Sequence, residues 1–114
     1  MQFTSSDAAD AAFQTELDAL RQRFLAGVPA RRAALMDAWR ACVDGAAEAA
    51  WLRLRDVAHK LSGSAPCYGL DALGAFAREL DGLLSARPPC RTRAAADAAV
   101  ERLLQALAAV GTGA

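Results

Sequence analysis

The chain has 114 residues, 54% of them hydrophobic and 23% charged, and its 13 basic residues balance 13 acidic ones. This length suits one domain with a single core, and the balanced charge gives no sign of the basic face expected of a nucleic-acid-binding protein. No apolar run reaches the roughly 20 residues of a membrane span. The first ten residues also lack the basic and then apolar pattern of a signal peptide, so we expect a cytoplasmic protein.

The residue types favour helices and give no sign of a metal site. Alanine, the best helix former, supplies much of the hydrophobic content, and only 6% of the residues are aromatic. Cys42, Cys67 and Cys90 are widely spaced and form no CxxC pair, and the chain has one histidine. These residues fit no common zinc pattern, so we expect an all-α protein with reduced thiols and no bound metal.

Two amphipathic segments open the chain, separated only by Gly27 and Pro29. The first is predicted to be a helix over residues 7–26, with Gly27 as its stop, and the second a helix over residues 29–43 that begins at Pro29. The two helices could also form one bent element. The apolar stripe predicted for the first helix is Phe13, Leu17, Leu20 and Phe24, and that of the second is Leu35, Met36, Trp39 and Val43.

The third predicted helix covers residues 46–65 and carries His59, the only histidine. Pro66 predicts a kink or an end near Ala65, because proline lacks a backbone donor and clashes with the preceding turn. Gly69 is predicted to end this segment before the next helix begins. At 100° per residue, the predicted buried face consists of Ala50, Leu54, Val57, Ala58, Leu61, Ala65 and Tyr68.

Two more helices complete the predicted fold, over residues 70–85 and 93–110, with a loop at 87–91 and an N-cap at Thr92. On the fourth helix, Arg78, Glu79 and Asp81 are expected to face solvent. Its predicted apolar face is Leu70, Leu73, Phe76, Ala77, Leu80, Leu83 and Leu84, and that of the fifth helix is Ala96, Val100, Leu103, Leu104 and Leu107. Short loops between amphipathic helices predict an antiparallel up-down-up-down four-helix bundle of the last four helices, with the additional N-terminal helix covering one end.

His59 falls opposite the buried face of its helix, so its imidazole should point toward solvent. Gly63 lies one turn further along the same face. A glycine inside a helix costs about 1 kcal/mol relative to alanine and usually has a packing or functional reason. Here it leaves the approach to His59 open to a bulky partner. The rest of this face consists of Leu52, Arg55, Asp56, Ser62 and Pro66.

The segment around His59 resembles the signature of the histidine-containing phosphotransfer (HPt) domain family. That pattern reads roughly Ala-His-x-Leu-Lys-Gly-Ser-Ala, followed by a glycine a few residues later. The chain departs from it at Ser62, where the family usually has Lys or Arg. The positions that match are Ala58, His59, Leu61, Gly63, Ser64, Ala65 and Gly69.

The resemblance covers about residues 10–110 of a single HPt-like domain and implies a phosphocarrier without autonomous catalytic activity. His59 would accept a phosphoryl group, through Nε2 as in the family, from an aspartate of a receiver domain and return it. The implied partners are a response-regulator receiver domain, a hybrid sensor histidine kinase, or both, with Mg²⁺ on the receiver and none on this monomeric chain. The face expected to contact them consists of Leu52, Arg55, Asp56, Lys60, Ser62, Gly63 and Pro66.

Two other classes of function remain open. The first is an adaptor or regulatory bundle that binds a receiver or kinase without carrying phosphate, a reading that rests on Ser62 in place of the usual cation. The second is a phosphatase or transferase on a similar bundle, for which Asp56 is the only acid predicted on the His59 face.

Overall fold

The computed structural model describes residues 3–45, 47–86 and 92–112, and within them the chain forms helices and no strand. The predicted loop at 87–91, including Cys90, and the predicted helix start at residue 46 lie outside the described residues. The helices are α1 (Phe3–Ala26), α2 (Val28–Gly45), α3 (Glu48–Ser64), the 3₁₀ turn η1 (Ala65–Tyr68), α4 (Asp71–Ser85) and α5 (Arg93–Thr112). None of the helices is long and apolar enough, over the described residues, to cross a membrane.

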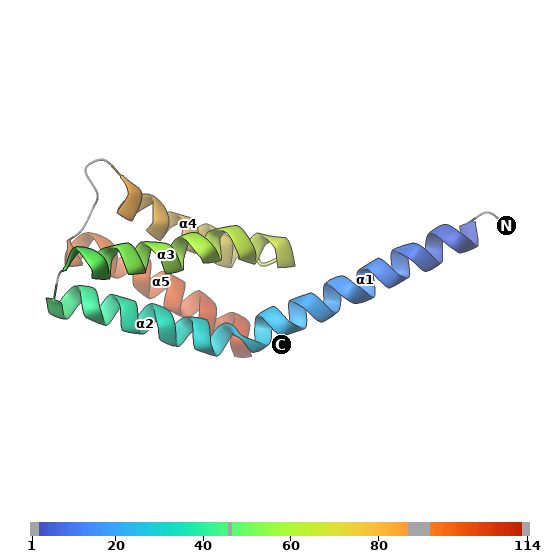
Figure 1. Cartoon of the computed structure of the whole chain (residues 1–114), viewed down its shortest axis with the longest axis horizontal. Coiled ribbons are helices and arrows are strands. Elements are labelled where there is room, and N and C mark those ends of the chain that lie inside the picture. The colour runs from blue at the N-terminus through green and yellow to red at the C-terminus, as the bar shows by residue number, and fades with distance from the viewer. Residues whose placement is uncertain (1–2, 46, 87–91, 113–114) are drawn as a thin grey trace.

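Helices α2 to α5 form the predicted antiparallel four-helix bundle. Each helix runs opposite to the one before it, and α3 packs against α2 and α4 while α5 packs against the same two helices from the other side (Figure 1). At the start of α5, the Thr92 hydroxyl accepts a hydrogen bond from the backbone N–H of Ala95 at 3.2 Å, which confirms the predicted cap. The all-α bundle predicted from the sequence is therefore the observed architecture.

One apolar core fills the bundle, and none of its buried members among the described residues is polar or charged. In α3 the buried residues recur every three or four positions, as predicted, at Leu54, Ala58 and Leu61. Trp39 and Trp51 meet edge to face with ring centroids 6.2 Å apart, so both tryptophans are packing residues. In α2 the fully buried residues are Val28, Leu35, Ala38 and Cys42, whereas Met36, Trp39 and Val43 are half-buried at the edge of the core.

Pro66 ends α3 as the sequence predicted. The helix stops at Ser64 and continues as η1, with the proline in its first turn. Gly69 closes η1 with a φ of 75°, a left-handed conformation that glycine adopts without a steric penalty. The N–H of Leu70 then donates to the Ala65 carbonyl at 3.1 Å, and α4 begins antiparallel to α3. This tight turn sets the two helices side by side next to His59.

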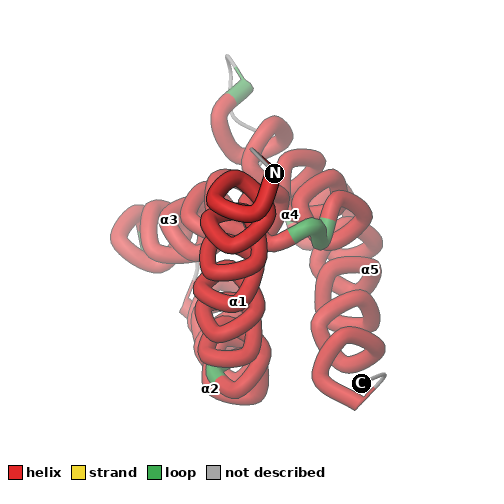
Figure 2. Tube along the Cα trace, turned by 90° about the vertical axis from the view of Figure 1, so that its right-hand side faces the viewer, coloured by secondary structure: helices red, strands yellow, loops and turns green. Residues whose placement is uncertain are grey.

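The prediction that the N-terminal helix covers one end of the bundle is wrong. Helix α1 projects away from the other helices along the direction of α2, and in Figure 2 it lies in front of α2 (Figures 1 and 2). Phe13 is 59% exposed and Leu20 is 41% exposed, so two of the four residues of the predicted apolar stripe lie outside the core, and Leu17 is half-buried. Helix α1 packs most closely at its C-terminal end. There Phe24 is buried and its ring stacks on Tyr68 at 4.8 Å.

The projection of α1 follows from the short connection to α2. Gly27 alone separates the two helices, and its N–H still donates to the carbonyls of Arg23 and Phe24, at 3.2 and 3.0 Å. The helical hydrogen bonds thus continue across the junction, because the N–H of Arg31 also bonds the Gly27 carbonyl. With only one residue between the helices, α1 cannot fold back over the bundle and instead continues away from it.

Candidate functional site

His59 lies on the solvent-facing side of α3, as the sequence predicted. Its side chain is 72% exposed, whereas Ala58 and Leu61 on the same helix are buried in the core. The helical period places His59 on the face opposite Ala58 and Leu61. Packing of those two residues in the core therefore holds the imidazole at the surface.

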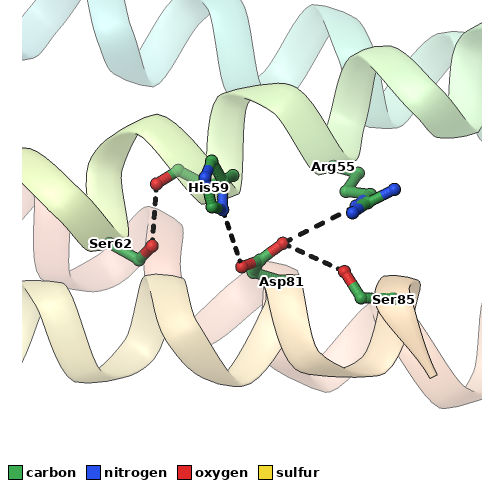
Figure 3. A network of polar contacts seen from close by, with 5 residues as sticks. All are labelled: Arg55, His59, Ser62, Asp81 and Ser85. Atoms are coloured by element: carbon green, nitrogen blue, oxygen red, sulfur yellow. Dashed lines mark hydrogen bonds and ion pairs between the residues drawn. The ribbon is translucent and has the colours of Figure 1, made fainter.

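A carboxylate from the neighbouring helix fixes the orientation of the imidazole. His59 Nδ1 is 3.1 Å from Asp81 Oδ2, and the Asp81 side chain is only 18% exposed (Figure 3). The other oxygen, Oδ1, accepts a hydrogen bond from the Ser85 hydroxyl at 3.2 Å and lies 3.9 Å from Arg55 Nε. Asp81 thus joins side chains of α3 and α4 in one polar network.

The expectation that Asp81 faces solvent is wrong, although Arg78 and Glu79 are exposed as predicted. Asp81 follows buried Ala77 by four residues and precedes buried Leu84 by three, so it borders the apolar face of α4. That spacing was the available signal, but it could not show which surface of α3 would lie opposite. The predicted acid of the His59 face, Asp56, instead pairs with Lys60, with Oδ2 and Nζ 3.0 Å apart.

The contact with Asp81 determines which ring nitrogen is free. An ionised carboxylate can only accept a hydrogen bond, so Nδ1 must carry the proton that it donates to Asp81. In the neutral imidazole, Nε2 then holds an unprotonated lone pair. With the ring exposed and Nδ1 turned toward α4, Nε2 is the nitrogen available to a reactant.

A shallow pocket beside the imidazole collects part of the predicted partner-contacting face. Leu52, Arg55, Asp56 and His59 line it, and Leu52 is 46% exposed. The pocket therefore offers an apolar side chain, a cation and an anion next to the one histidine. Lys60 lies at its margin through the ion pair with Asp56.

The other three predicted residues follow His59 toward the end of α3. The Ser62 hydroxyl donates to the His59 carbonyl oxygen at 2.7 Å, so it is folded against its own helix. Apart from the adjacent backbone of its own helix, nothing lies within 4 Å of where a Cβ on Gly63 would stand, so the space beyond the imidazole is open. Pro66 is turned toward α4, where its ring packs on Gly74.

Neither of the two thiols that the structure describes takes part in this site. Cys42 is buried among core residues, and this burial raises the pKa of its thiol. Cys67 is exposed on η1, and its Sγ lies 3.4 Å from the Gly63 carbonyl oxygen. Across the part of the chain that the structure describes, no three His, Cys, Asp or Glu side chains cluster closely enough to hold a metal ion.

A family model described as the Hpt domain matches residues 8–113 of this chain. The chain belongs to the Hpt domain family. Hpt domains are phosphocarrier modules that work in two-component signalling with receiver domains and kinases. The comparisons with curated protein sequences and with solved structures found no match. The helical bundle and the family assignment agree with the resemblance seen at His59.

Proposed function

We propose that this Hpt domain shuttles a phosphoryl group between Nε2 of His59 and aspartates of receiver domains. The observation that supports it best is the pairing of His59 with Asp81. The pairing leaves Nε2 unprotonated and exposed on a rigid helix, while Nδ1 is hydrogen-bonded at 3.1 Å. An exposed neutral imidazole of this kind is a good nucleophile toward an acyl phosphate.

In the transfer, the Nε2 lone pair forms a bond to phosphorus as the bond from phosphorus to the receiver's aspartyl oxygen breaks. The electron pair of the broken bond stays on the aspartate, which leaves as a carboxylate. The Nδ1 proton stays in place, so the imidazole ring becomes positively charged next to the Asp81 carboxylate. Asp81 is thus a positioning residue that also stabilises the charge formed on the ring. The reverse transfer restores the neutral ring.

The partner in this proposal is a response-regulator receiver domain, a hybrid sensor histidine kinase, or both. Mg²⁺ belongs to the receiver, where it would neutralise charge on the transferred phosphoryl group. On this chain, exposed Leu52 supplies an apolar contact beside His59, and the open space at Gly63 admits the bulk of the receiver. A transient encounter of this type needs only a small interface.

The test is phosphoryl transfer from a receiver domain loaded with acyl phosphate to the full chain, beside His59→Gln. We expect acid-labile, base-stable label on the wild-type chain and none on the variant. Asp81→Asn should slow the transfer, because an amide can also accept from Nδ1 but carries no charge to offset the charged ring.

Three outcomes would contradict the proposal. Label that remains in His59→Gln would place the phosphoryl group on another residue. Binding to receivers with no label on the wild type would favour the adaptor function. Loss of phosphate from the receiver without any label on this chain would favour a phosphatase.

A further inference from the structure

We infer that Arg55 is the residue of this chain that binds the phosphoryl group on His59, an inference that rests on the proposed function. A phosphoryl group carries close to two negative charges near neutral pH and presents three acceptor oxygens. Placed on an exposed nitrogen, it needs a cation within reach. The described structure allows the side chains around His59 to be compared for that role.

Arg55 lies one helical turn before His59 and lines the same pocket. The two side chains share a partner, because Asp81 lies between them, contacting His59 through one oxygen and facing Arg55 through the other (Figure 3). The Arg55 Nε to Asp81 Oδ1 separation of 3.9 Å is longer than a hydrogen bond, and the side chain is 49% exposed. Arg55 therefore shares a pocket with the imidazole and is only loosely held by Asp81.

The neighbouring polar side chains are less suited to this role. Lys60 is 100° around the helix from His59, and its ammonium is 3.0 Å from the Asp56 carboxylate. Ser62 has no charge, and its one hydroxyl proton is donated to the His59 carbonyl at 2.7 Å. Among the described residues that line the pocket with His59, Arg55 is the one cation.

The chemistry of the guanidinium matches the requirement. Arginine stays protonated and presents several N–H donors in a planar fork that can bond two phosphoryl oxygens at once. It exchanges no proton during the transfer, so the bonds made and broken are those already described. When Nε2 is phosphorylated, the loosely held guanidinium turns from Asp81 toward the phosphoryl oxygens, and Asp81 keeps its bond to Nδ1.

A small chemical donor tests this without any receiver. Phosphoramidate would be supplied to the full chain, and the rate of labelling and the lifetime of the phosphohistidine would be followed by phosphorus NMR. Arg55→Gln should slow labelling at least about fivefold, because losing one charge pair at about 4 Å costs that much even when the pair is fully screened by bulk water. Arg55→Lys should label at a rate between those of the wild type and Arg55→Gln, because lysine keeps the positive charge but lacks the planar fork of N–H donors.

Two controls separate this role from a structural one. Arg53→Gln removes an exposed cation from the same helix about 120° away from His59, and it should label at the wild-type rate. Ser62→Lys, one turn beyond His59, should restore labelling in the Arg55→Gln background, since a structural loss would not be repaired by a charge on the opposite side.

Each contrary outcome has a distinct meaning. Wild-type labelling rates in Arg55→Gln would overturn the role of Arg55 while leaving the proposed function intact. If Arg53→Gln slowed labelling as much as Arg55→Gln, the role of Arg55 would also be overturned, because the slower labelling would then result from the lower net charge of the chain. If the wild-type chain took no label, or His59→Gln took as much, the proposed function itself would fail and this inference with it.

Discussion

Gly63 leaves an open space one turn beyond His59, and that space has a measurable consequence. Because a Cβ at this exposed position would meet nothing within 4 Å beyond the adjacent backbone of its own helix, Gly63→Leu should fold normally. Its stability should stay constant or rise by up to about 1 kcal/mol, since glycine is the poorer helix former. The leucine side chain should nevertheless obstruct a receiver. We expect slow transfer from a phosphorylated receiver but normal labelling by phosphoramidate.

The matched control for this prediction is Gly63→Ala, which gains helix propensity with little bulk and should transfer at nearly the wild-type rate. Normal transfer from the receiver to a folded Gly63→Leu chain would show that the partner does not approach over this turn. Slow labelling by phosphoramidate would instead show that the leucine disturbs His59 itself.

Of the site, the sequence predicts the residues on α3 and misses the one on α4. His59, Arg55 and Gly63 share a face because the 3.6-residue period relates positions along one helix. Asp81 is 22 positions from His59 in the chain, and its contact depends on how α4 is rotated and shifted against α3. A single sequence contains no direct measure of that register, and the pattern of α4 alone does not indicate the contact of Asp81 with His59.

At the level of the elements, the contact of α4 with η1 depends on the small size of Gly74. A Cβ at this buried position would stand 2.7 Å from Pro66 Cγ and 2.9 Å from Cδ, and a proline ring cannot rotate away. Gly74→Ala should therefore push α4 and η1 apart. We expect urea unfolding to show a loss of about 1–3 kcal/mol from overpacking.

Gly82→Ala is the internal control, because Gly82 lies in the same helix with nothing within 4 Å of its Cβ. Both substitutions replace glycine by alanine and so gain the same helix propensity. The difference between their free energies of unfolding therefore reports the contact with Pro66. Gly82→Ala should stabilise the chain by up to about 1 kcal/mol. Equal stability of the two variants would mean that α4 and η1 are not packed as closely as described.

The helices themselves were largely predictable, since each boundary has a local chemical cause. Pro66 ends α3, Thr92 caps α5, and Gly69 makes the left-handed turn before α4. The buried faces of α3, α4 and α5 follow from the same period. Helix α1 also forms as expected, but its amphipathic pattern indicates only that one side is apolar and does not identify the surface that would cover it.

For the whole molecule, the projecting α1 changes the overall shape. The radius of gyration of the Cα atoms is 17.4 Å, and the molecule extends 64 × 29 × 20 Å. A compact domain of this length would have a radius of gyration of about 13 Å. The difference is large enough to decide, by solution scattering, whether α1 projects or folds back over the bundle.

We expect small-angle X-ray scattering of the full chain to give a radius of gyration near 17.4 Å and the forward scattering of a monomer. Gly27→Ala should leave both values unchanged. A Cβ at Gly27 meets the Phe24 and Arg23 carbonyl oxygens and Arg31 Nε at ordinary contact distances of 3.5 to 3.8 Å, and alanine favours a helix that continues across the junction.

A radius near 13 Å for the wild type would mean that α1 folds back and buries Phe13 and Leu20 on the bundle. A doubled mass would instead mean that a second copy covers them.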